Sequence, residues 1–270
     1  MEVTGRFAPS PTGPLHLGSL VAALGSWLFA RRAGGRWLVR MEDLDAPRVV
    51  PGSAEEILET LRRYDLQWDG EVVFQSQRTA LYEAALAILR EQNLVYDCGC
   101  SRADLQRAAS APIAGETIYP GTCRNGLPPG KTPRAIRFRA SDESIAFDDL
   151  LCGRTEAKAD DFIVRRADGV FAYQLAVVVD DAEQGVTQVV RGRDLLSSTP
   201  RQIALQRALG YPTPDYAHLP LVLNEDGSKL GKRDGALPLP LLDEEKVAAT
   251  KQWAMEFVTV AMRAGIDPAI

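Results

Sequence analysis

The sequence is poor in several residue types, and each shortage narrows the class of protein. Among 270 residues there are only two histidines and four cysteines. Four cysteines in a chain of this length, without an export signal, favour reduced thiols or a metal site over a disulfide framework. The first ten residues, "MEVTGRFAPS", lack the basic and apolar regions of a secretory signal. We therefore expect a cytoplasmic protein.

Long hydrophobic runs are also absent from the sequence. No apolar stretch approaches the roughly 20 residues of a membrane span, so we expect no membrane partner. The composition is 46% hydrophobic and 25% charged, which is typical of a globular protein with one large domain or two modest ones. We find no internal repeat and no segment that indicates a dimer interface, and we expect a monomer.

Positive charge is scarce overall but concentrated in one region. The chain carries a net charge of -5, which argues weakly against a nucleic-acid partner. Residues 98–139, however, contain seven basic residues and only two acidic ones. The basic residues are Arg102, Arg107, Arg124, Lys131, Arg134, Arg137 and Arg139, and the acidic ones are Asp104 and Glu116. Such a run is most often a solvated face, but it is also compatible with a surface for a polyanion.

Hydrophobic periodicity predicts an α/β protein. Strand-like and helical segments alternate through the first third of the chain: strands at 2–9, 36–45 and 71–76, and helices at 19–35, 52–66 and 78–93. Ser53, with Glu56 three residues later, predicts a capping box at the start of the second helix. The alternation indicates a Rossmann-type, doubly wound parallel sheet, whose ligands bind at the carboxyl ends of the strands.

The alternation is interrupted and then resumes. Residues 95–160 lack long periodic runs and hold the cysteines, which indicates an insertion. The expected elements after it are two strands within 161–181 around a turn at 167–169, a strand at 186–192, a helix at 193–210, a strand at 218–227 and a helix at 243–265. We expect a first catalytic half at 1–94, an insertion at 95–160, a second catalytic half at 161–235 and a helical tail at 236–270.

The loop "PSPTGPLHLGSL" after the first strand has the residues of a phosphate site. Its prolines fix φ angles, and Gly13 and Gly18 let a ligand approach the backbone. His16 and Ser19 stand at the start of a helix, whose free N–H groups favour phosphate. The alternative is a proline-rich turn with a capping serine.

A second loop, "NEDGSKLGKRDG", follows the last expected strand. It clusters Ser228, Lys229, Lys232 and Arg233 between glycines. Such a loop suits closure over a triphosphate, although alone it is more typical of an exposed hairpin tip with solvated lysines.

Together, "RFAPSPTGPLHLGS" and "SKLGKR" resemble the two nucleotide-binding signatures of class I aminoacyl-tRNA synthetases. "RMEDLDAPR" and "VVDDAEQGVTQVVRGRDLLSSTPRQ" are similar to the glutamyl branch, and the resemblance covers most of residues 3–235. The sequence departs from the commoner pattern at Ser19, where a second histidine is usual elsewhere in the class, and at Gly231, where a serine hydroxyl would contact ATP.

The resemblance implies ATP-dependent activation of L-glutamate, with Mg²⁺ accompanying ATP. By this resemblance, the catalytic residues are His16 and Lys232, the glutamate-binding residues are Arg6, Ala8, Ser10, Glu42, Tyr173 and Arg191, and the ATP-binding residues are His16, Gly18, Ser19, Lys229 and Lys232. From the sequence alone, Tyr173 could also be a packing residue. We interpret His218 as structural.

The cysteines also fit this resemblance. Cys98, Cys100 and Cys123, with Tyr119, resemble a structural zinc site of three cysteines and a tyrosine, in an insertion whose spacing from Cys100 to Tyr119 is longer than usual. Zinc prefers four ligands and readily takes thiolates. The alternative is three buried or reactive thiols. Cys152 has no partner in the pattern and is most simply a core residue.

The chain continues for only about 35 residues after Gly235. This length resembles the truncated glutamyl-queuosine tRNA(Asp) synthetase family, which transfers glutamate to queuosine in the anticodon of tRNA(Asp). The alternatives are a short glutamyl-tRNA synthetase that charges the 3′ end of tRNA(Glu), and a zinc-stabilised nucleic-acid-binding module without catalysis. A small-molecule nucleotidyltransferase would leave the glutamate residues unexplained.

Overall fold

The computed structural model of the chain describes all residues except 1, 102, 105–118, 224–238, 240–242 and 265–270. The described helices are α1 (Leu17–Arg32), α2 (Ser53–Arg63), α3 (Thr79–Glu91), α5 (Tyr173–Glu183), α6 (Thr199–Leu209) and α7 (Glu244–Ala264). The strands are β1 (Thr4–Phe7), β2 (Arg36–Met41), β3 (Val73–Phe74), β4 (Val95–Cys98), β5 (Ala135–Phe138), β6 (Ser144–Asp149), β7 (Gly153–Lys158), β8 (Phe162–Arg165), β9 (Gln188–Gly192) and β10 (Asp215–Leu219).

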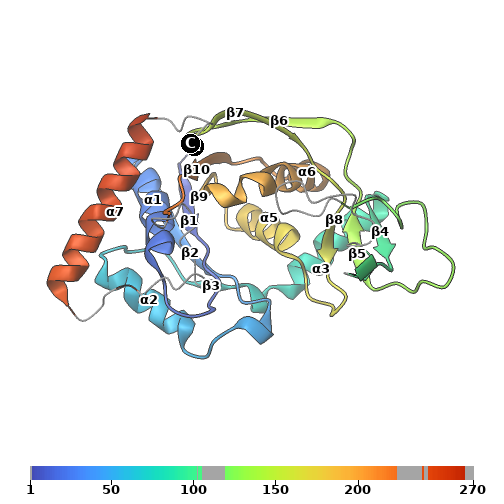
Figure 1. The fold of residues 1–270 in the computed structure, drawn as a ribbon, viewed down its shortest axis with the longest axis horizontal. Coiled ribbons are helices and arrows are strands. Elements are labelled where there is room, and N and C mark those ends of the chain that lie inside the picture. Colours follow the sequence, from blue (N-terminus) through green and yellow to red (C-terminus); the bar gives the residue numbers. More distant parts are fainter. Residues whose placement is uncertain (1, 102, 105–118, 224–238, 240–242, 265–270) are drawn as a thin grey trace.

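A parallel sheet forms the centre of the molecule (Figure 1). β1 pairs with β2 and β2 with β3, while β9 pairs with β10 and β10 with β6, all in parallel. The two groups meet where β1 lies beside β9: the backbone N–H of Thr187, just before β9, donates to the carbonyl of Thr4 at 3.0 Å. Across the sheet the strands follow the order β3-β2-β1-β9-β10. The strand numbers fall as far as β1 and rise from β9, so the strand order reverses between β1 and β9. The predicted doubly wound arrangement is confirmed, and this switch point is where a ligand site is expected.

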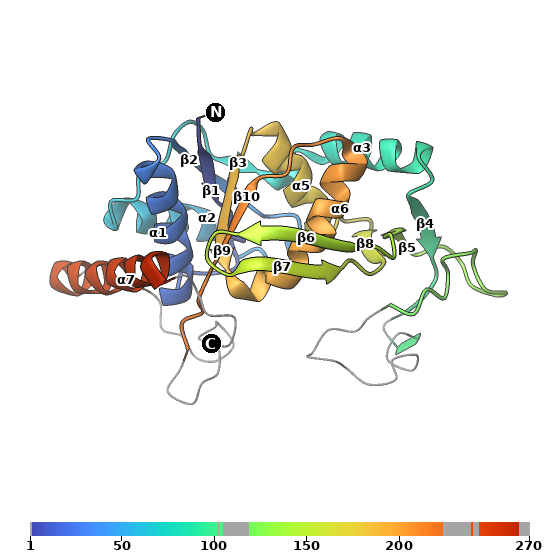
Figure 2. The same ribbon diagram turned by 90° about the horizontal axis from the view of Figure 1, so that it is seen from above.

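Helices cover both faces of the sheet, and strand alternation explains why. Trp37 and Val39 of β2 pack in one hydrophobic core with α1, α2 and α7, whereas Leu38 between them packs in a second core with α3, α5 and α6. Val189 and Val190 of β9 divide between the two cores in the same way. Successive side chains of a strand point to opposite faces. Figure 2 shows α1 and α5 on opposite sides of the strands, with α7 outside α1.

The prediction of a second strand within residues 161–181 is wrong. β8 forms, and the expected turn follows, but the second strand is reduced to a single bridge between Arg165 and Phe171. The apolar run from Tyr173 is instead helix α5. Residues Leu175–Val179 are at most 3% exposed, so the helix is buried on all sides and its sequence shows no amphipathic period. Its three consecutive valines favour a strand locally, and tertiary packing overrides that preference.

Residues 95–160 contain strands of two sheets. β4, β5 and the later β8 form an antiparallel three-stranded sheet at the end of the molecule opposite α7 (Figure 1). The β6–β7 hairpin instead joins the main sheet through β10. This hairpin brings Asp149, at the end of β6, beside the strands that carry the predicted site.

The remaining predictions differ mainly in their boundaries. The last strand begins at Asp215 and ends at Leu219, earlier than expected, and a 3₁₀ turn over Arg193–Ser198 precedes α6. The expected C-terminal helix is confirmed as α7. Within the described part of the chain, no helix combines the length and hydrophobicity needed to span a bilayer.

Candidate active site

The proline-rich loop after β1 is fixed to the segment that follows β2. Glu42 and Val50 donate their backbone N–H groups to the carbonyls of Pro9 and Pro11, both at 2.9 Å. The Ser53 hydroxyl accepts from the N–H of Gly13 at 2.9 Å and donates to its carbonyl at 3.0 Å. The predicted capping box is therefore wrong: Ser53 is the first residue of α2 and makes no cap. Its hydroxyl instead holds Gly13, whose φ of 118° favours glycine.

Helix α1 begins directly after this loop, with His16 as its N-cap. The His16 Nδ1 accepts from the backbone N–H of Ser19 at 3.3 Å, so the cap is the histidine and not the serine. An accepting Nδ1 places the proton of the neutral ring on Nε2, which makes Nε2 a hydrogen-bond donor. The helix start thus combines an imidazole N–H with the positive end of the helix dipole, which suits a phosphate.

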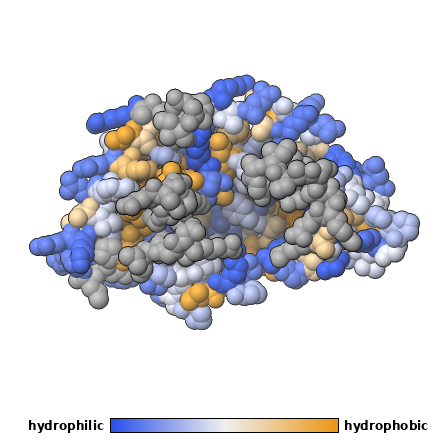
Figure 3. Space-filling model, in the orientation of Figure 1, coloured by the Kyte–Doolittle hydropathy of each residue, from blue (hydrophilic) through white to orange (hydrophobic). Residues whose placement is uncertain are grey.

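A cavity of about 580 Å³ opens at the carboxyl ends of β1, β2 and β9. In the orientation of Figure 1, the molecular surface is hollowed near its middle (Figure 3). All six residues predicted for glutamate line the cavity, as do three of the five predicted for ATP: Arg6, Ala8, Ser10, Glu42, Tyr173 and Arg191, with His16, Gly18 and Ser19. Lys229 and Lys232 lie outside the described residues. Residues far apart in sequence therefore converge on one space large enough for an amino acid and a nucleotide.

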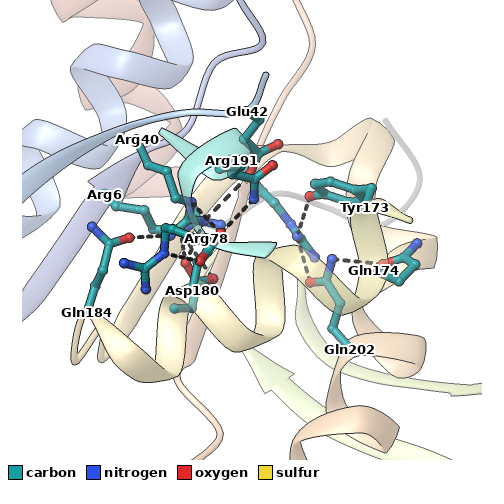
Figure 4. Close-up of polar contacts among 12 residues, drawn as sticks. Arg6, Arg40, Glu42, Arg78, Tyr173, Gln174, Asp180, Gln184, Arg191 and Gln202 are labelled. Atoms are coloured by element: carbon teal, nitrogen blue, oxygen red, sulfur yellow. Dashed lines mark hydrogen bonds and ion pairs between the residues drawn. The ribbon is translucent and has the colours of Figure 1, made fainter. Parts of the chain in front are cut away.

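Buried ion pairs form the floor of the cavity (Figure 4). Asp181, in α5, accepts from Arg6 Nε at 3.1 Å and pairs with Arg40 Nη2 at 2.8 Å. Although burial opposes it, the two arginines hold the pKa of Asp181 below its usual value. The Arg40 guanidinium is fully buried and also donates from Nη1 to Gln184 at 2.7 Å. These contacts fix Arg6 beside the cavity.

The adjacent Asp180 belongs to the same buried network and pairs with Arg40 Nε at 3.7 Å. Its carboxylate accepts hydrogen bonds from Gln75 Nε2 at 2.8 Å, from Arg78 Nε at 2.6 Å and from the Tyr82 hydroxyl at 2.8 Å. Sequence reasoning missed this network. The only signal was the pair of acids at the end of an apolar run, which is equally typical of a solvent-facing strand end.

Glu42, one of two acids that line the cavity, has a carboxylate oxygen without a hydrogen bond in the described part of the chain. Its Oε1 is buried and accepts none from the described part of the chain, and its nearest cation is Arg40 Nη2 at 3.5 Å. Burial, the largest influence, raises the pKa of Glu42 to about 7, although Arg40 and Arg6 oppose the rise. A buried carboxylate with an open lone pair is an acceptor suited to an ammonium group.

Arg191, at the end of β9, supplies the second cation of the cavity. Its shortest hydrogen bonds anchor the guanidinium from behind: Nη1 donates to Gln202 and Nη2 to Thr199, both at 2.8 Å. The contacts to residues that line the cavity are longer, at 3.3 Å to the Tyr173 hydroxyl and 3.3 Å to the carbonyl of Leu195. The side that faces the cavity is thus the more weakly bonded one, where a carboxylate could compete.

The three predicted cysteines lie together at the end of the β4–β5–β8 sheet. The Sγ atoms of Cys98, Cys100 and Cys123 lie within 4.8 Å of one another, and the Tyr119 hydroxyl lies 3.5 Å from Cys98 and 3.8 Å from Cys100. Cys100 and Cys123 are 3.6 Å apart. A tetrahedral zinc site with ordinary bond lengths would separate two sulfurs by about 3.8 Å and a sulfur from an oxygen by about 3.5 Å. The four residues therefore fit a tetrahedral metal site, and their soft thiolates fit zinc.

A buried arginine contacts this thiol cluster. Arg137 Nε donates to Cys98 Sγ at 3.3 Å, and its guanidinium stacks on the Tyr119 ring at 3.7 Å. Although burial opposes it, hydrogen bonds including that from Arg137 lower the pKa of Cys98, which favours the thiolate that a metal binds. Cys152 lies apart, in the core near His218, as predicted.

Comparison with known proteins agrees with this picture. The family model "tRNA synthetases class I (E and Q), catalytic domain" matches residues 2–269. A glutamyl-Q tRNA(Asp) synthetase of Geobacter sulfurreducens is 61% identical over 243 residues, covering 88% of this chain and 77% of the relative. One from Thiobacillus denitrificans is 60% identical over 240 residues, covering 87% and 79%.

A solved structure is similar as well. The glutamate-tRNA synthetase of Elizabethkingia anophelis superposes with a TM-score of 0.76 at 34% identity, covering 87% of this chain. The chain spans about half the length of that synthetase, 53%.

Proposed function

Since the chain belongs to the class I tRNA synthetases for glutamate and glutamine, as their catalytic domain, we propose that it activates L-glutamate with ATP and transfers it to queuosine in tRNA(Asp). Relatives of 60–61% identity that bear the name glutamyl-Q tRNA(Asp) synthetase support this acceptor. The observation that carries the proposal is the cavity, which brings Glu42, whose buried Oε1 has no hydrogen bond from the described residues, together with Arg6 and Arg191.

The arrangement of the cavity matches the charges of glutamate. The substrate has one ammonium and two carboxylates, and the charged residues that line the cavity include Glu42, Arg6 and Arg191. Glu42 accepts from the ammonium, and the guanidinium of Arg191 with the Tyr173 hydroxyl receives a carboxylate. Ala8 and Ser10, in the fixed loop, border the same space.

The reaction has two steps, and neither requires an enzyme nucleophile. An oxygen of the glutamate α-carboxylate attacks the α-phosphorus of ATP, and pyrophosphate leaves. A hydroxyl of the queuosine cyclopentenediol then attacks the acyl carbon, and AMP leaves. His16 donates from Nε2 to a phosphate oxygen, and Gly18 and Ser19 border the nucleotide. Mg²⁺ supplies charge neutralisation on the phosphates when ATP is bound. Positioning supplies most of the catalysis, since orientation alone is worth roughly 7–11 kcal/mol.

The structural partner that we propose for the thiol cluster is one zinc ion. Cys98, Cys100 and Cys123 would hold it with Tyr119 as the fourth ligand, and its role would be to order the end of the β4–β5–β8 sheet. The four cysteines are free thiols, which suits a protein that works in the reducing cytoplasm. We propose that the chain acts as a monomer, because no segment of its sequence indicates a dimer interface.

The decisive experiment supplies radiolabelled glutamate, ATP and tRNA from cells with or without queuosine. We expect label only in queuosine-containing tRNA(Asp). Equal labelling of queuosine-free tRNA, at the 3′ end of tRNA(Glu), would contradict the proposed acceptor and favour a short glutamyl-tRNA synthetase.

A second measurement tests Lys232, which the family resemblance assigns to ATP. Lys232→Ala should reduce glutamate-dependent ATP–pyrophosphate exchange by about a hundredfold or more, because a positive charge assigned to the phosphates is lost. The thermal unfolding temperature should not change. Unaltered exchange would exclude the assigned role.

A further inference from the structure

Behind Arg191 lies a buried pair of residues that the reaction outlined above does not use. His218, on β10, and Asp149, at the end of β6, contact each other through His218 Nδ1 and Asp149 Oδ2 at 2.5 Å. The histidine has no exposed surface. One of only two histidines in the chain is therefore placed inside the protein next to the cavity arginine.

Asp149 is held as a carboxylate that can only accept. Its Oδ1 accepts from the backbone N–H groups of Leu151 at 3.0 Å, Cys152 at 2.9 Å and His218 at 3.2 Å. Although burial opposes it, the hydrogen bonds from His218 and Cys152 keep the pKa of Asp149 below its usual value. The Nδ1 of His218 must therefore carry a proton.

The other ring nitrogen faces Arg191. Arg191 Nε lies 3.0 Å from His218 Nε2, and a guanidinium N–H can only donate. Burial and the Arg191 charge lower the pKa of His218, so the ring is neutral and Nε2 offers a lone pair. The tautomer imposed by Asp149 is the one that Arg191 requires. Thr199, whose hydroxyl lies 3.3 Å from Nε2, also accepts from Arg191 Nη2 and stands on the same rear side.

We propose that His218, oriented by Asp149, is a positioning residue that fixes the guanidinium plane of Arg191 for glutamate. A hydrogen bond at Nε fixes the plane of the guanidinium, and with it the direction of the two terminal nitrogens. On the cavity side, Nη1 donates to the Tyr173 hydroxyl and Nη2 to the carbonyl of Leu195, two residues that line the cavity. The hydrogen bonds from Asp149 through His218 to Arg191 thus connect the β6–β7 hairpin to the part of the cavity proposed to bind glutamate. This inference rests on the proposed binding of glutamate by Arg191.

Two substitutions test separately the hydrogen bonds that the two ring nitrogens of His218 make. His218→Gln can place an amide oxygen near the position of Nε2 and keep an acceptor for Arg191. His218→Asn can place an amide N–H near Nδ1, which keeps the donor to Asp149 but leaves Arg191 Nε unpaired. Each leaves one buried polar group without its partner, so both should lower the free energy of unfolding by similar amounts.

The measurement is steady-state ATP–pyrophosphate exchange, with KM determined separately for glutamate and for ATP. Loss of a hydrogen bond to a charged group predicts a KM for glutamate about tenfold or more above wild type in His218→Asn. His218→Gln should restore most of that loss, and the KM for ATP should stay within about twofold in both, because no changed contact faces the nucleotide. Equal glutamate KM values in the two variants would overturn the positioning role. Wild-type protein without glutamate-dependent exchange would instead refute the proposed function.

A second measurement does not depend on activity. The ¹⁵N NMR spectrum of histidine-labelled protein contains two ring systems, and His218→Gln assigns them. We expect the neutral ring of His218 to carry its proton on Nδ1 in the free protein. A proton on Nε2 would overturn the inference whether or not the enzyme is active.

Discussion

The cavity floor and the thiol cluster are both buried groups of ionisable side chains, but they balance their charges differently. The floor sets three arginines against three acids: Arg6, Arg40 and Arg78 against Glu42, Asp180 and Asp181. The thiol cluster sets three thiols and a phenol against Arg137. The floor is therefore balanced in charge without a ligand, although Glu42 Oε1 keeps an open lone pair for one, whereas the cluster as a set of thiolates needs a cation to be stable.

The largest expected effect comes from breaking the thiol cluster. Cys98→Ser should reduce bound zinc from one per chain to near zero, and amide hydrogen exchange should become much faster in β4 and β5, because metal binding supplies folding free energy there. Metal analysis and exchange mass spectrometry measure the two quantities.

The matched control for that change is Cys152→Ser. Cys152 is also a buried free thiol, but it lies outside the cluster, so its serine variant should keep full zinc content. Wild-type protein purified without zinc, or equal zinc in both variants, would refute the metal site and the contrast drawn from it.

The next effect comes from unbalancing the floor. Asp181→Asn removes the partner of Arg6 and leaves Arg40 with the more distant Glu42 and Asp180, so one buried positive charge is no longer balanced. We expect a loss of about 3–5 kcal/mol in the free energy of unfolding in urea. Asp148→Asn is the control, because its pair with Arg154 is exposed and should change stability by about 1 kcal/mol or less. Similar losses in both variants would mean that burial does not distinguish these pairs.

The sequence predicts the parts of this protein that depend on periodicity and on loop chemistry. Helix α1 and the placement of the first loop and of Glu42 at carboxyl ends of strands follow from alternating elements and the rule that ligands lie at a switch point. The resemblance to a family carried the residue roles, which spacing alone left open.

The sequence could not predict the contacts that support those residues. Helix α5 is buried on every side, so its valines gave no helical period. Asp180 and His218 act through partners more than 25 positions away, such as Tyr82 and Arg191, and no local pattern marks such pairs. Ser53 looked like a helix cap because its distant partner, Gly13, cannot be seen in a single short stretch. Long-range polar contacts are decided by packing, after the local pattern has been satisfied.

The smallest expected effect is a pH dependence, which tests whether Glu42 is ionised and the charges of the floor balance. Glu42 is buried beside Arg40 and Arg6, with Asp180 and Asp181 nearby, and its pKa is raised to about 7. Protonated Glu42 cannot pair with an ammonium ion, so glutamate should bind more weakly as the pH falls below 7, by about tenfold per pH unit, and binding should level off above it. Glutamate binding by calorimetry between pH 5.5 and 8.5 should show this slope together with proton release. Glu42→Gln should bind glutamate more weakly and lose the slope in this range. A flat profile in the wild type would mean that Glu42 stays ionised throughout and that the floor already holds its third negative charge.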